Sequence, residues 1–408
     1  MCYYDSNYMN KLQISKRGQE VIASPIRKFL PLLQDAEKRG IKVYKLNTGD
    51  PDLDAPALFF DEVRSYKSKN LPYAPSPGMR EHVIAWQKYY KQFGVEIEPE
   101  NIIPTVGCAE AIFLALMACA DVDDEILVFE PLYVSYKSMA KMIGVKLVPI
   151  TLKTSDNFTL PTSSEIGSKI TSRTRAIVII NPDNPTGKLW TKDEIDSILK
   201  IAKENNLFVI SDETYREIRF NGEPSCLLSK MDERENIIVV DSVSKRFSMP
   251  GARVGCVASY NKEIMHTILK FAQARLSVGT LEQYGLIPLL ENSKQYTEPA
   301  RLEYSKRCEV VYQMLSRMPG VVVNRPYGAF YIYAALPVDS AEEFVKFMIR
   351  DFSFNNETIM ISPMPDFYIT PGLGINEIRI AYVLNTKDLE RSMQILQKGL
   401  DAYSKRKS

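Results

Sequence analysis

The residue with the clearest capacity for chemistry is Lys245, which lies in a polar segment between two apolar runs. The runs at 237–241 and 254–258 are rich in β-branched residues, and we expect both to be buried strands. A lysine in such a loop has two interpretations. It is either a solvated loop residue, or an amine nucleophile whose pKa is lowered by desolvation so that it can form a Schiff base.

Two side chains near Lys245 are suited to binding a phosphate group. Ser242 offers a hydroxyl, and Arg253 offers a guanidinium that can bind phosphate in a bidentate manner. Together they would place a phosphorylated aldehyde against the lysine amine. This combination favours the nucleophile interpretation of Lys245.

The segment 242–255 also resembles the cofactor-lysine signature of the class I aminotransferases, the aspartate aminotransferase family that depends on pyridoxal phosphate. That signature has a small residue, an apolar residue, Ser, Lys and, after a spacer, Gly-x-Arg-x-Gly. The resemblance extends to Asn-Pro-Asp-Asn-Pro-Thr-Gly at 181–187, to 212–215 and to Arg379, and it covers nearly the whole chain. It implies that Lys245 holds pyridoxal 5′-phosphate as a Schiff base.

The resemblance implies roles for four residues around the cofactor ring. Asp212 would keep the pyridine nitrogen protonated, because a cationic ring is a better sink for carbanion electrons. Tyr215 would hydrogen-bond the ring oxygen and lower the pKa of the Schiff base, Asn184 would contact both that oxygen and the substrate carboxylate, and Tyr133 would stack on the ring. From the residues alone, Asp212 could instead cap a helix and Tyr133 could be a core residue.

The cofactor phosphate has further candidate ligands in two loops. Gly107, Cys108 and Ala109 follow an apolar run and begin a helix, where unpaired backbone N–H groups can hold a phosphate. The family usually has a hydroxyl residue among these positions, so one side-chain contact is expected to be missing. Tyr73 precedes a Pro/Ser/Gly turn, and the resemblance implies that it reaches the phosphate of a neighbouring subunit in an obligate homodimer.

Substrate recognition is expected at three further positions besides Asn184. Arg379 lies inside an apolar strand at 377–381, where an unpaired buried arginine would be costly, and the resemblance implies that it binds the substrate α-carboxylate. The backbone of Gly49 would approach the same carboxylate. Arg275 lies near the position where some members place an arginine that binds a side-chain carboxylate, but it could equally be a structural residue at a helix end.

The elements that must position these residues alternate between strand and helix. Apolar runs separated by helical segments predict a mainly parallel α/β sheet, and most candidates follow the end of a predicted strand. A helical stretch at 11–40, with a helix start near Pro25, precedes the sheet. The strands expected in the sheet are 103–106, 126–129, 176–180, 207–211, 237–241 and 254–258, and shorter strands follow at 321–323, 329–333 and 377–381.

The resemblance implies the type I fold of pyridoxal-phosphate-dependent transferases. This fold has a large domain with a mainly parallel seven-stranded sheet, here 57–292. It also has a small α+β domain built from both chain ends, here 1–56 and 293–408.

Composition excludes several other classes of protein. The 408 residues carry a net charge of +1 with no large basic block, which gives no indication of nucleic-acid binding. No apolar run is long enough to span a membrane and no signal peptide is recognisable, so a cytoplasmic protein is expected. Six scattered cysteines and two histidines predict no metal site, and the lack of Gly-x-Gly-x-x-Gly after an early strand argues against a nicotinamide dehydrogenase.

The implied function is transfer of an amino group from an L-amino acid, aspartate or another common one, to a 2-oxo acid such as 2-oxoglutarate. The reaction would be a ping-pong sequence through aldimine and ketimine, with the neutral Lys245 amine moving the α-proton. A lyase, decarboxylase or oxidase with the same cofactor is the first alternative. A non-catalytic regulatory protein is the second, and the presence of Lys245, Asp212 and Arg379 argues against it. The sequence does not fix the preferred side chain or the pathway.

Overall fold

A computed structural model describes residues 12–21, 27–230 and 234–406 of the chain. The helical stretch expected before the first strand is divided into α1 (Lys16–Glu20) and α2 (Leu30–Lys38). The helix start predicted near Pro25 lies outside the described residues.

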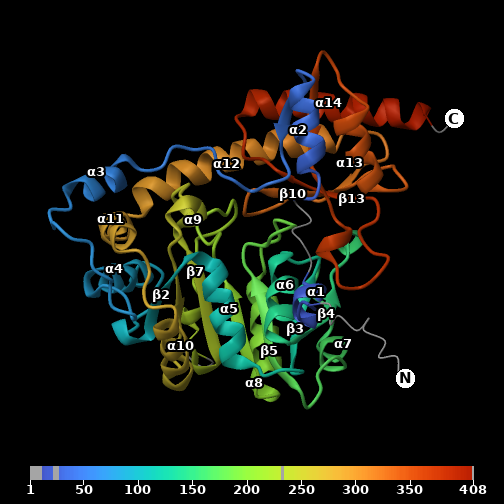
Figure 1. Ribbon diagram of the computed structural model, residues 1–408. Coiled ribbons are helices and arrows are strands. Elements are labelled where there is room, and N and C mark those ends of the chain that lie inside the picture. Colours follow the sequence, from blue (N-terminus) through green and yellow to red (C-terminus); the bar gives the residue numbers. More distant parts are fainter. Residues whose placement is uncertain (1–11, 22–26, 231–233, 407–408) are drawn as a thin grey trace, which may run out of the picture.

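The largest element is a seven-stranded sheet that crosses the lower half of the molecule in Figure 1. Every neighbouring pair is parallel except the pairs made by β8, which runs antiparallel to both of its neighbours. The α/β class and the seven strands implied by the resemblance are therefore confirmed. In spatial order the strands are β2 (Ile102–Thr105), β8 (Gly255–Ala258), β7 (Ile237–Ser242), β6 (Phe208–Asp212), β5 (Thr174–Ile180), β3 (Glu125–Glu130) and β4 (Lys146–Thr151).

Strand β4 is the one strand of this sheet that we did not predict from a run of residues. It lies at the edge of the sheet and pairs only with β3. Only one of its six residues is buried, and Pro149 stands in its middle. Proline is tolerated at an edge because no further strand needs its missing N–H, but in a sequence it argues against a strand.

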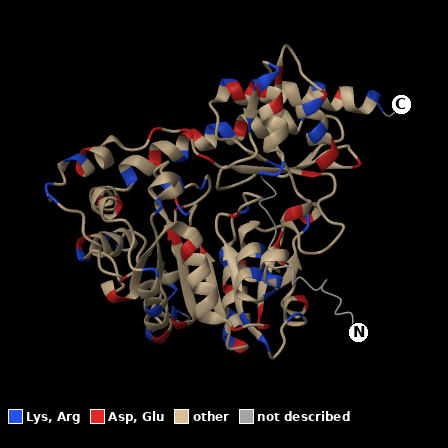
Figure 2. Ribbon diagram, in the orientation of Figure 1, with Lys and Arg blue, Asp and Glu red and all other residues tan. Residues whose placement is uncertain are grey.

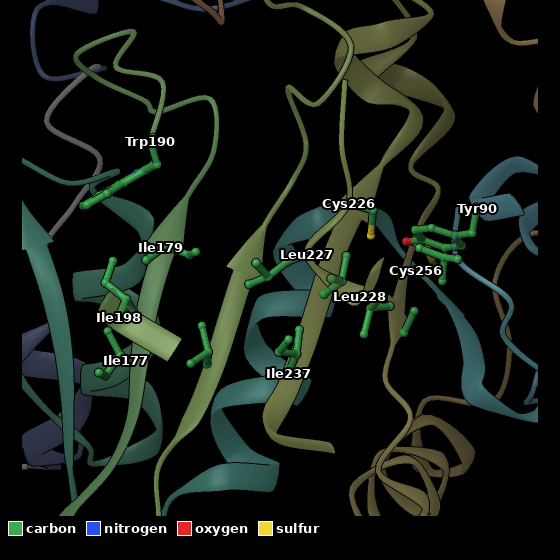
Figure 3. Packing of buried hydrophobic residues seen from close by; sticks show 14 of the residues in the cluster. Tyr90, Ile177, Ile179, Trp190, Ile198, Cys226, Leu227, Leu228, Ile237 and Cys256 are labelled. Carbon is green, nitrogen blue, oxygen red and sulfur yellow. The ribbon is translucent and has the colours of Figure 1, made fainter. Parts of the chain in front are cut away.

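Side chains alternate between the two faces of the sheet, and each face has its own apolar core. In β5, Ile177 and Ile179 pack on one face with Ile198, and Figure 3 shows all three on that side. Ala176 and Val178 pack on the opposite face. The first face is covered by α4 (Arg80–Lys91), α8 (Lys192–Glu204) and α11 (Thr280–Glu291), and the second by α5 (Gly107–Cys119), α6 (Ser135–Ile143) and α10 (Lys262–Ala274).

Above this sheet lies a second layer with two smaller sheets (Figure 1). One has the order β12 (Ser362–Pro363), β13 (Glu377–Ala381), β10 (Tyr331–Ala335) and β9 (Val322–Val323), and the other pairs β1 (Lys42–Lys45) in parallel with β11 (Glu357–Met360). Their core includes residues of α2, α12 (Lys294–Leu315), α13 (Ala341–Arg350) and α14 (Thr386–Lys405).

The predicted domain limits stay a prediction, although all strands of the large sheet lie within 57–292 and all strands of the smaller sheets lie outside it. Basic and acidic residues are interspersed along the helices of both layers, as Figure 2 shows. None of the described helices combines the length and apolar character needed to cross a bilayer.

Candidate active site

A cavity of about 420 Å³ lies between the large sheet and the smaller sheets. It opens where β5, β6 and β7 reach their carboxyl ends, the place where open α/β sheets bind ligands. The structure therefore brings most of the sequence-predicted residues to one place. Those that line the cavity are Gly49, Cys108, Ala109, Tyr133, Asn184, Asp212, Tyr215, Ser242, Lys245, Arg253 and Arg379.

Lys245 enters the cavity from the short helix α9 (Val243–Arg246), which begins directly after β7. Its Nζ donates a hydrogen bond to the Gly49 carbonyl over 2.6 Å. Burial lowers the pKa of this amine to about 8, and the charges of Arg379 and Arg253 act in the same direction. This pKa lies well below the ordinary value of 10.5, so a larger share of the amine is neutral near physiological pH, and the neutral form is the one that a nucleophile or general base needs.

Asp212 is the last residue of β6, and only 5% of it is exposed. It accepts hydrogen bonds from the Thr214 backbone N–H over 3.2 Å and from the Tyr136 hydroxyl over 3.3 Å. Burial raises the pKa of this carboxyl to about 6. No basic side chain of the described residues forms an ion pair with it, so the site contains a desolvated anion suited to a cationic ring nitrogen.

At the other end of the cavity, Arg253 and the N-terminus of α5 form an anion-binding surface. The Arg253 guanidinium donates to the Pro250 carbonyl over 2.9 Å and to the Val106 carbonyl over 3.3 Å, and it pairs with no carboxylate of the described residues. Gly107 has φ +72°, and a Cβ there would lie 2.7 Å from Arg253 Nη2. The first backbone N–H groups of α5 have no partner within the helix. Because Gly107 has no Cβ, a phosphate can approach these N–H groups beside Arg253.

Hydroxyl groups complete the anion-binding surface. Ser242 Oγ lies 2.7 Å from Ser244 Oγ, and both residues line the cavity. The thiol of Cys108 donates to Asp212 Oδ1 over 3.7 Å, and burial raises the pKa of this thiol, so it stays protonated. Ser244 was not among the predicted residues, and it adds a hydroxyl to a site in which Cys108 and Ala109 have none.

Arg379 stands in β13, is 1% exposed and faces the same cavity. Its Nη1 donates to Asn184 Oδ1 over 2.9 Å and its Nη2 to the Asn47 carbonyl over 2.6 Å, while its buried Nε has no partner. Its guanidinium lies over the rings of Tyr331 and Phe367, and burial lowers its pKa. No carboxylate of the described residues forms an ion pair with Arg379, so a buried cation here is ready for a carboxylate ligand.

Tyr215 and Tyr331 share a hydrogen bond of 2.8 Å between their hydroxyl groups beside the cavity. Burial raises the pKa of the Tyr215 hydroxyl, and the adjacent Tyr331 adds to this effect. A side chain at Gly49 would overlap the Tyr331 hydroxyl, which explains why a glycine approaches the site here. Nothing in the sequence singles out Tyr331 beyond its place in an apolar strand.

Two predicted residues lie away from this cavity. Arg275 pairs with Glu110 over 3.1 Å and donates to the Pro104 carbonyl over 2.6 Å, as a structural helix-end arginine would. Tyr73 is 80% exposed on the chain surface. Its contact with the cofactor phosphate of a neighbouring subunit stays a prediction.

A buried network of charges lies directly behind Lys245 and Asp212. Arg216 pairs with Glu213 over 2.6 Å and with Asp241 over 2.8 Å, and Arg246 pairs with Asp241 and with Glu217. Glu213, Arg216 and Glu217 follow Asp212 in the sequence, Asp241 precedes Ser242, and Arg246 follows Lys245. The network therefore ties the ends of β6 and β7 to α9. Removing one partner of such a group would leave another charge buried and unpaired.

The donor set fits pyridoxal 5′-phosphate at three separate points: a phosphate-binding end at Arg253 and α5, a lone carboxylate at Asp212, and a desolvated amine at Lys245. The profile of the family described as aminotransferase class I and II matches residues 41–396. The chain belongs to this family. It is a pyridoxal-phosphate-dependent aminotransferase.

Relatives with different substrates in their names resemble this aminotransferase to a similar degree. It is 31% identical to an aspartate aminotransferase of Pyrococcus horikoshii, over 88% of this chain and 91% of that relative. It is 29% identical to aromatic-amino-acid aminotransferase 2 of Thermococcus litoralis, over 95% and 98% of the two chains. The structure of an alanine aminotransferase from Pyrococcus furiosus matches with a TM-score of 0.87 and 30% identity, over 96% of this chain and 100% of that one. These likenesses establish the reaction type and leave the amino donor open.

Proposed function

We propose that this aminotransferase moves the amino group of L-aspartate to a 2-oxo acid such as 2-oxoglutarate in two half-reactions. The observation that supports a carboxylate-bearing substrate most directly is the buried Arg379 guanidinium, which lines the same cavity as Lys245 and pairs with no carboxylate of the described residues. Aspartate is named for several relatives, including the one from Pyrococcus horikoshii. The substrate α-carboxylate would take the place opposite Arg379, with Asn184 beside it.

In this proposal the predicted residues that line the cavity divide the work of holding the cofactor and the substrate. Arg253, Ser242 and the first turn of α5, including Gly107, Cys108 and Ala109, hold the phosphate. Tyr133, Asn184 and Tyr215 orient the ring, and Asp212 holds a proton on the ring nitrogen. When bound, the cofactor supplies an electron-accepting ring that stabilises the negative charge left on the α-carbon.

Lys245 moves the proton in this mechanism. Its Nζ would accept the α-proton of the substrate, because a pKa near 8 makes the neutral amine far more accessible near neutral pH than the ordinary lysine pKa of 10.5 does. Because Gly49 accepts a hydrogen bond from Nζ, the amine is held at the cavity wall that also carries Arg379.

The functional unit in this proposal is a homodimer with shared sites. Tyr73 is 80% exposed, and Leu71 beside it and Phe60 in α3 (Ala57–Ser65) are also exposed. In the dimer, Tyr73 of each chain would contact the cofactor phosphate of the other. Mixing Tyr73→Ala chains with Lys245→Ala chains would then create one intact site per heterodimer, and recovery of activity on mixing tests this directly.

We place this enzyme in the cytoplasm. The five cysteines among the described residues are all unpaired, and four of them are buried, as expected of a protein from a reducing compartment.

The experiment that tests the function separates the two half-reactions. Purified enzyme loaded with pyridoxal 5′-phosphate is mixed with aspartate alone, and oxaloacetate is measured. The proposal predicts about one equivalent of oxaloacetate per site, and continuous turnover after 2-oxoglutarate is added, because each half-reaction regenerates the partner form. Repeated turnover without a 2-oxo acid acceptor, with release of carbon dioxide or ammonia, would contradict the proposal. A reaction with alanine or phenylalanine but none with aspartate would show that the amino donor is one of those amino acids instead of aspartate.

A further inference from the structure

The active-site cavity contains more positive charge than the cofactor and one substrate carboxylate can use. Its described lining has four cationic side chains, Arg27, Lys245, Arg253 and Arg379, and one acidic side chain, Asp212. Three of the cations already have roles in the proposed function. Arg253 faces the phosphate, Arg379 faces the α-carboxylate, and Lys245 works as a neutral amine.

Arg27 is the cation without a role. It lines the cavity and forms no ion pair with a carboxylate of the described residues. No sequence pattern singles out Arg27, because it follows Pro25 in a stretch that we expected to be an ordinary helix. An arginine that borders an active-site cavity without an acidic partner is a natural ligand for an anion carried by the substrate.

The two residues that follow Arg27 are held by contacts with distant parts of the chain, while Arg27 itself is exposed at the cavity. Lys28 pairs with Glu342 over 2.6 Å and with Asp366 over 2.9 Å, and Phe29 is buried in the core of the smaller sheets. Asp366 belongs to the 3₁₀ turn Pro365–Phe367, whose last ring lies under the Arg379 guanidinium. The chain that carries Arg27 and the wall that carries Arg379 are therefore fastened to the same turn.

The alternative arginine is already neutralised. Arg275 Nε pairs with Glu110 Oε1 over 3.1 Å, and its Nη2 donates to the Pro104 carbonyl over 2.6 Å. Both partners of this ion pair are largely buried, and Arg275 does not line the cavity. A substrate carboxylate would have to displace Glu110 before it could bind there.

We propose that Arg27 is the specificity-determining residue that binds the side-chain carboxylate of a dicarboxylic substrate. The substrate class is therefore the acidic amino acids and their 2-oxo acids. Both half-reactions use the same contact, since aspartate and 2-oxoglutarate each carry a second carboxylate. This inference rests on the proposed aminotransferase function and adds to it the residue that selects acidic side chains.

The test compares dicarboxylate and monocarboxylate ligands of the cofactor-loaded enzyme. Dissociation constants for succinate and butyrate, two unreactive acids of equal carbon number, are measured by calorimetry for the wild type, Arg27→Met and Arg27→Lys. We expect Arg27→Met to weaken succinate binding by about 10- to 100-fold, the loss typical of one charged hydrogen-bonded contact. Butyrate binding should change less than about twofold, and Arg27→Lys should lie between the wild type and Arg27→Met.

Steady-state kinetics give a second measurement. For Arg27→Met, kcat/KM should fall for aspartate and hold for alanine, mainly through KM, because the contact is equally strong before and during the reaction. Arg39→Met is the matched control, since Arg39 lies at the end of α2 and donates to the Ile349 and Arg350 carbonyls instead of lining the cavity.

Each outcome decides one question. A wild-type enzyme that binds succinate no better than butyrate, or an Arg27→Met variant that keeps the succinate preference, would overturn the role of Arg27. Loss of that preference in Arg275→Met with Arg27→Met unchanged would assign the contact to Arg275. Failure of the wild type to transfer an amino group from any amino acid would contradict the proposed function itself. Turnover of alanine by Arg27→Met tests that function separately from the role of Arg27.

Discussion

Arg379 Nη1 donates a hydrogen bond to Asn184 Oδ1 over 2.9 Å, and this contact joins the two layers of the molecule. Arg379 belongs to β13 in a smaller sheet, whereas Asn184 lies in the loop that follows β5 in the large sheet. A substrate carboxylate placed at this pair would therefore be held by both layers at once. The position of one layer relative to the other then controls how well the substrate is aligned with Lys245.

Replacing Arg379 by Gln should remove α-carboxylate binding and keep the cofactor. We expect kcat/KM for every amino acid to fall by about 100- to 1,000-fold, because a bidentate guanidinium–carboxylate contact is lost. Cofactor content measured by absorbance should stay near one per chain. Arg391→Gln, which removes a guanidinium that pairs with Glu357 from α14, is the control and should leave kcat/KM unchanged. An equal loss in both variants would point to an effect on folding.

Asp212 should make the cofactor-free protein less stable as pH rises. Burial raises the pKa of Asp212 from 3.8 to about 6, so the folded state binds more protons than the unfolded state between these values. The stability that protonated Asp212 provides is complete below pH 3.8 and is lost as pH rises through about 6. Asp212→Asn avoids this loss, and its free energy of unfolding relative to wild type should increase by about 2 kcal/mol between pH 4 and pH 7.

Denaturant unfolding of both cofactor-free proteins across this pH range measures that difference, with the exposed Asp401→Asn as control. The same Asp212→Asn variant should lose at least about 100-fold in kcat once loaded with cofactor, since the anion that holds the ring cationic is missing. A pH-independent stability difference would contradict the described burial of Asp212, and retained kcat would contradict its role.

Gly107→Ala should weaken cofactor binding through the phosphate end alone. The added Cβ would stand 2.7 Å from Arg253 Nη2, and the φ of +72° is unfavourable for alanine. We expect the dissociation constant of pyridoxal 5′-phosphate to rise by about 10-fold or more, while pyridoxal, which lacks the phosphate, binds as before. Gly251→Ala is the matched control, because a Cβ at Gly251 meets nothing within 4 Å.

Loading of the cofactor should depend on pH through Lys245. Only the neutral amine attacks an aldehyde, and burial lowers the pKa of Lys245 to about 8. The rate of covalent attachment to cofactor-free protein should therefore rise about tenfold per pH unit up to pH 7 and level off above about pH 9. Stopped-flow absorbance from pH 6 to 10 measures it. A rate that still rises steeply at pH 10 would show an amine with the ordinary pKa of an exposed lysine.

The sequence predicted those parts of the site that have a distinctive local pattern. Asp212, Asn184 and Lys245 lie at or after the carboxyl ends of buried strands, which meet at one edge of a parallel sheet. Arg253 comes just before β8, which is antiparallel to β7 and therefore begins at the same edge. Their assembly around one cavity follows from this topology. The edge strand β4 could not be predicted in the same way, because it is half exposed and contains proline.

Other features depend on contacts between distant segments. Arg275 and Glu110 are 165 residues apart, and only the packing of α10 against α5 shows that they neutralise each other. Arg27 reaches the cavity because Lys28 is anchored at Glu342 and Asp366, more than 300 residues along the chain. Neither relationship leaves a periodic or motif-like trace in the sequence.

Covalent binding of pyridoxal 5′-phosphate by Lys245 can be measured directly. Cofactor-loaded enzyme is reduced with sodium borohydride, digested and analysed by mass spectrometry, since reduction fixes the cofactor on the amine that holds it. We predict one phosphopyridoxyl group per chain, on the peptide that contains Lys245, and none in Lys245→Ala. Attachment to another lysine, or no attachment in folded wild-type protein, would contradict the account.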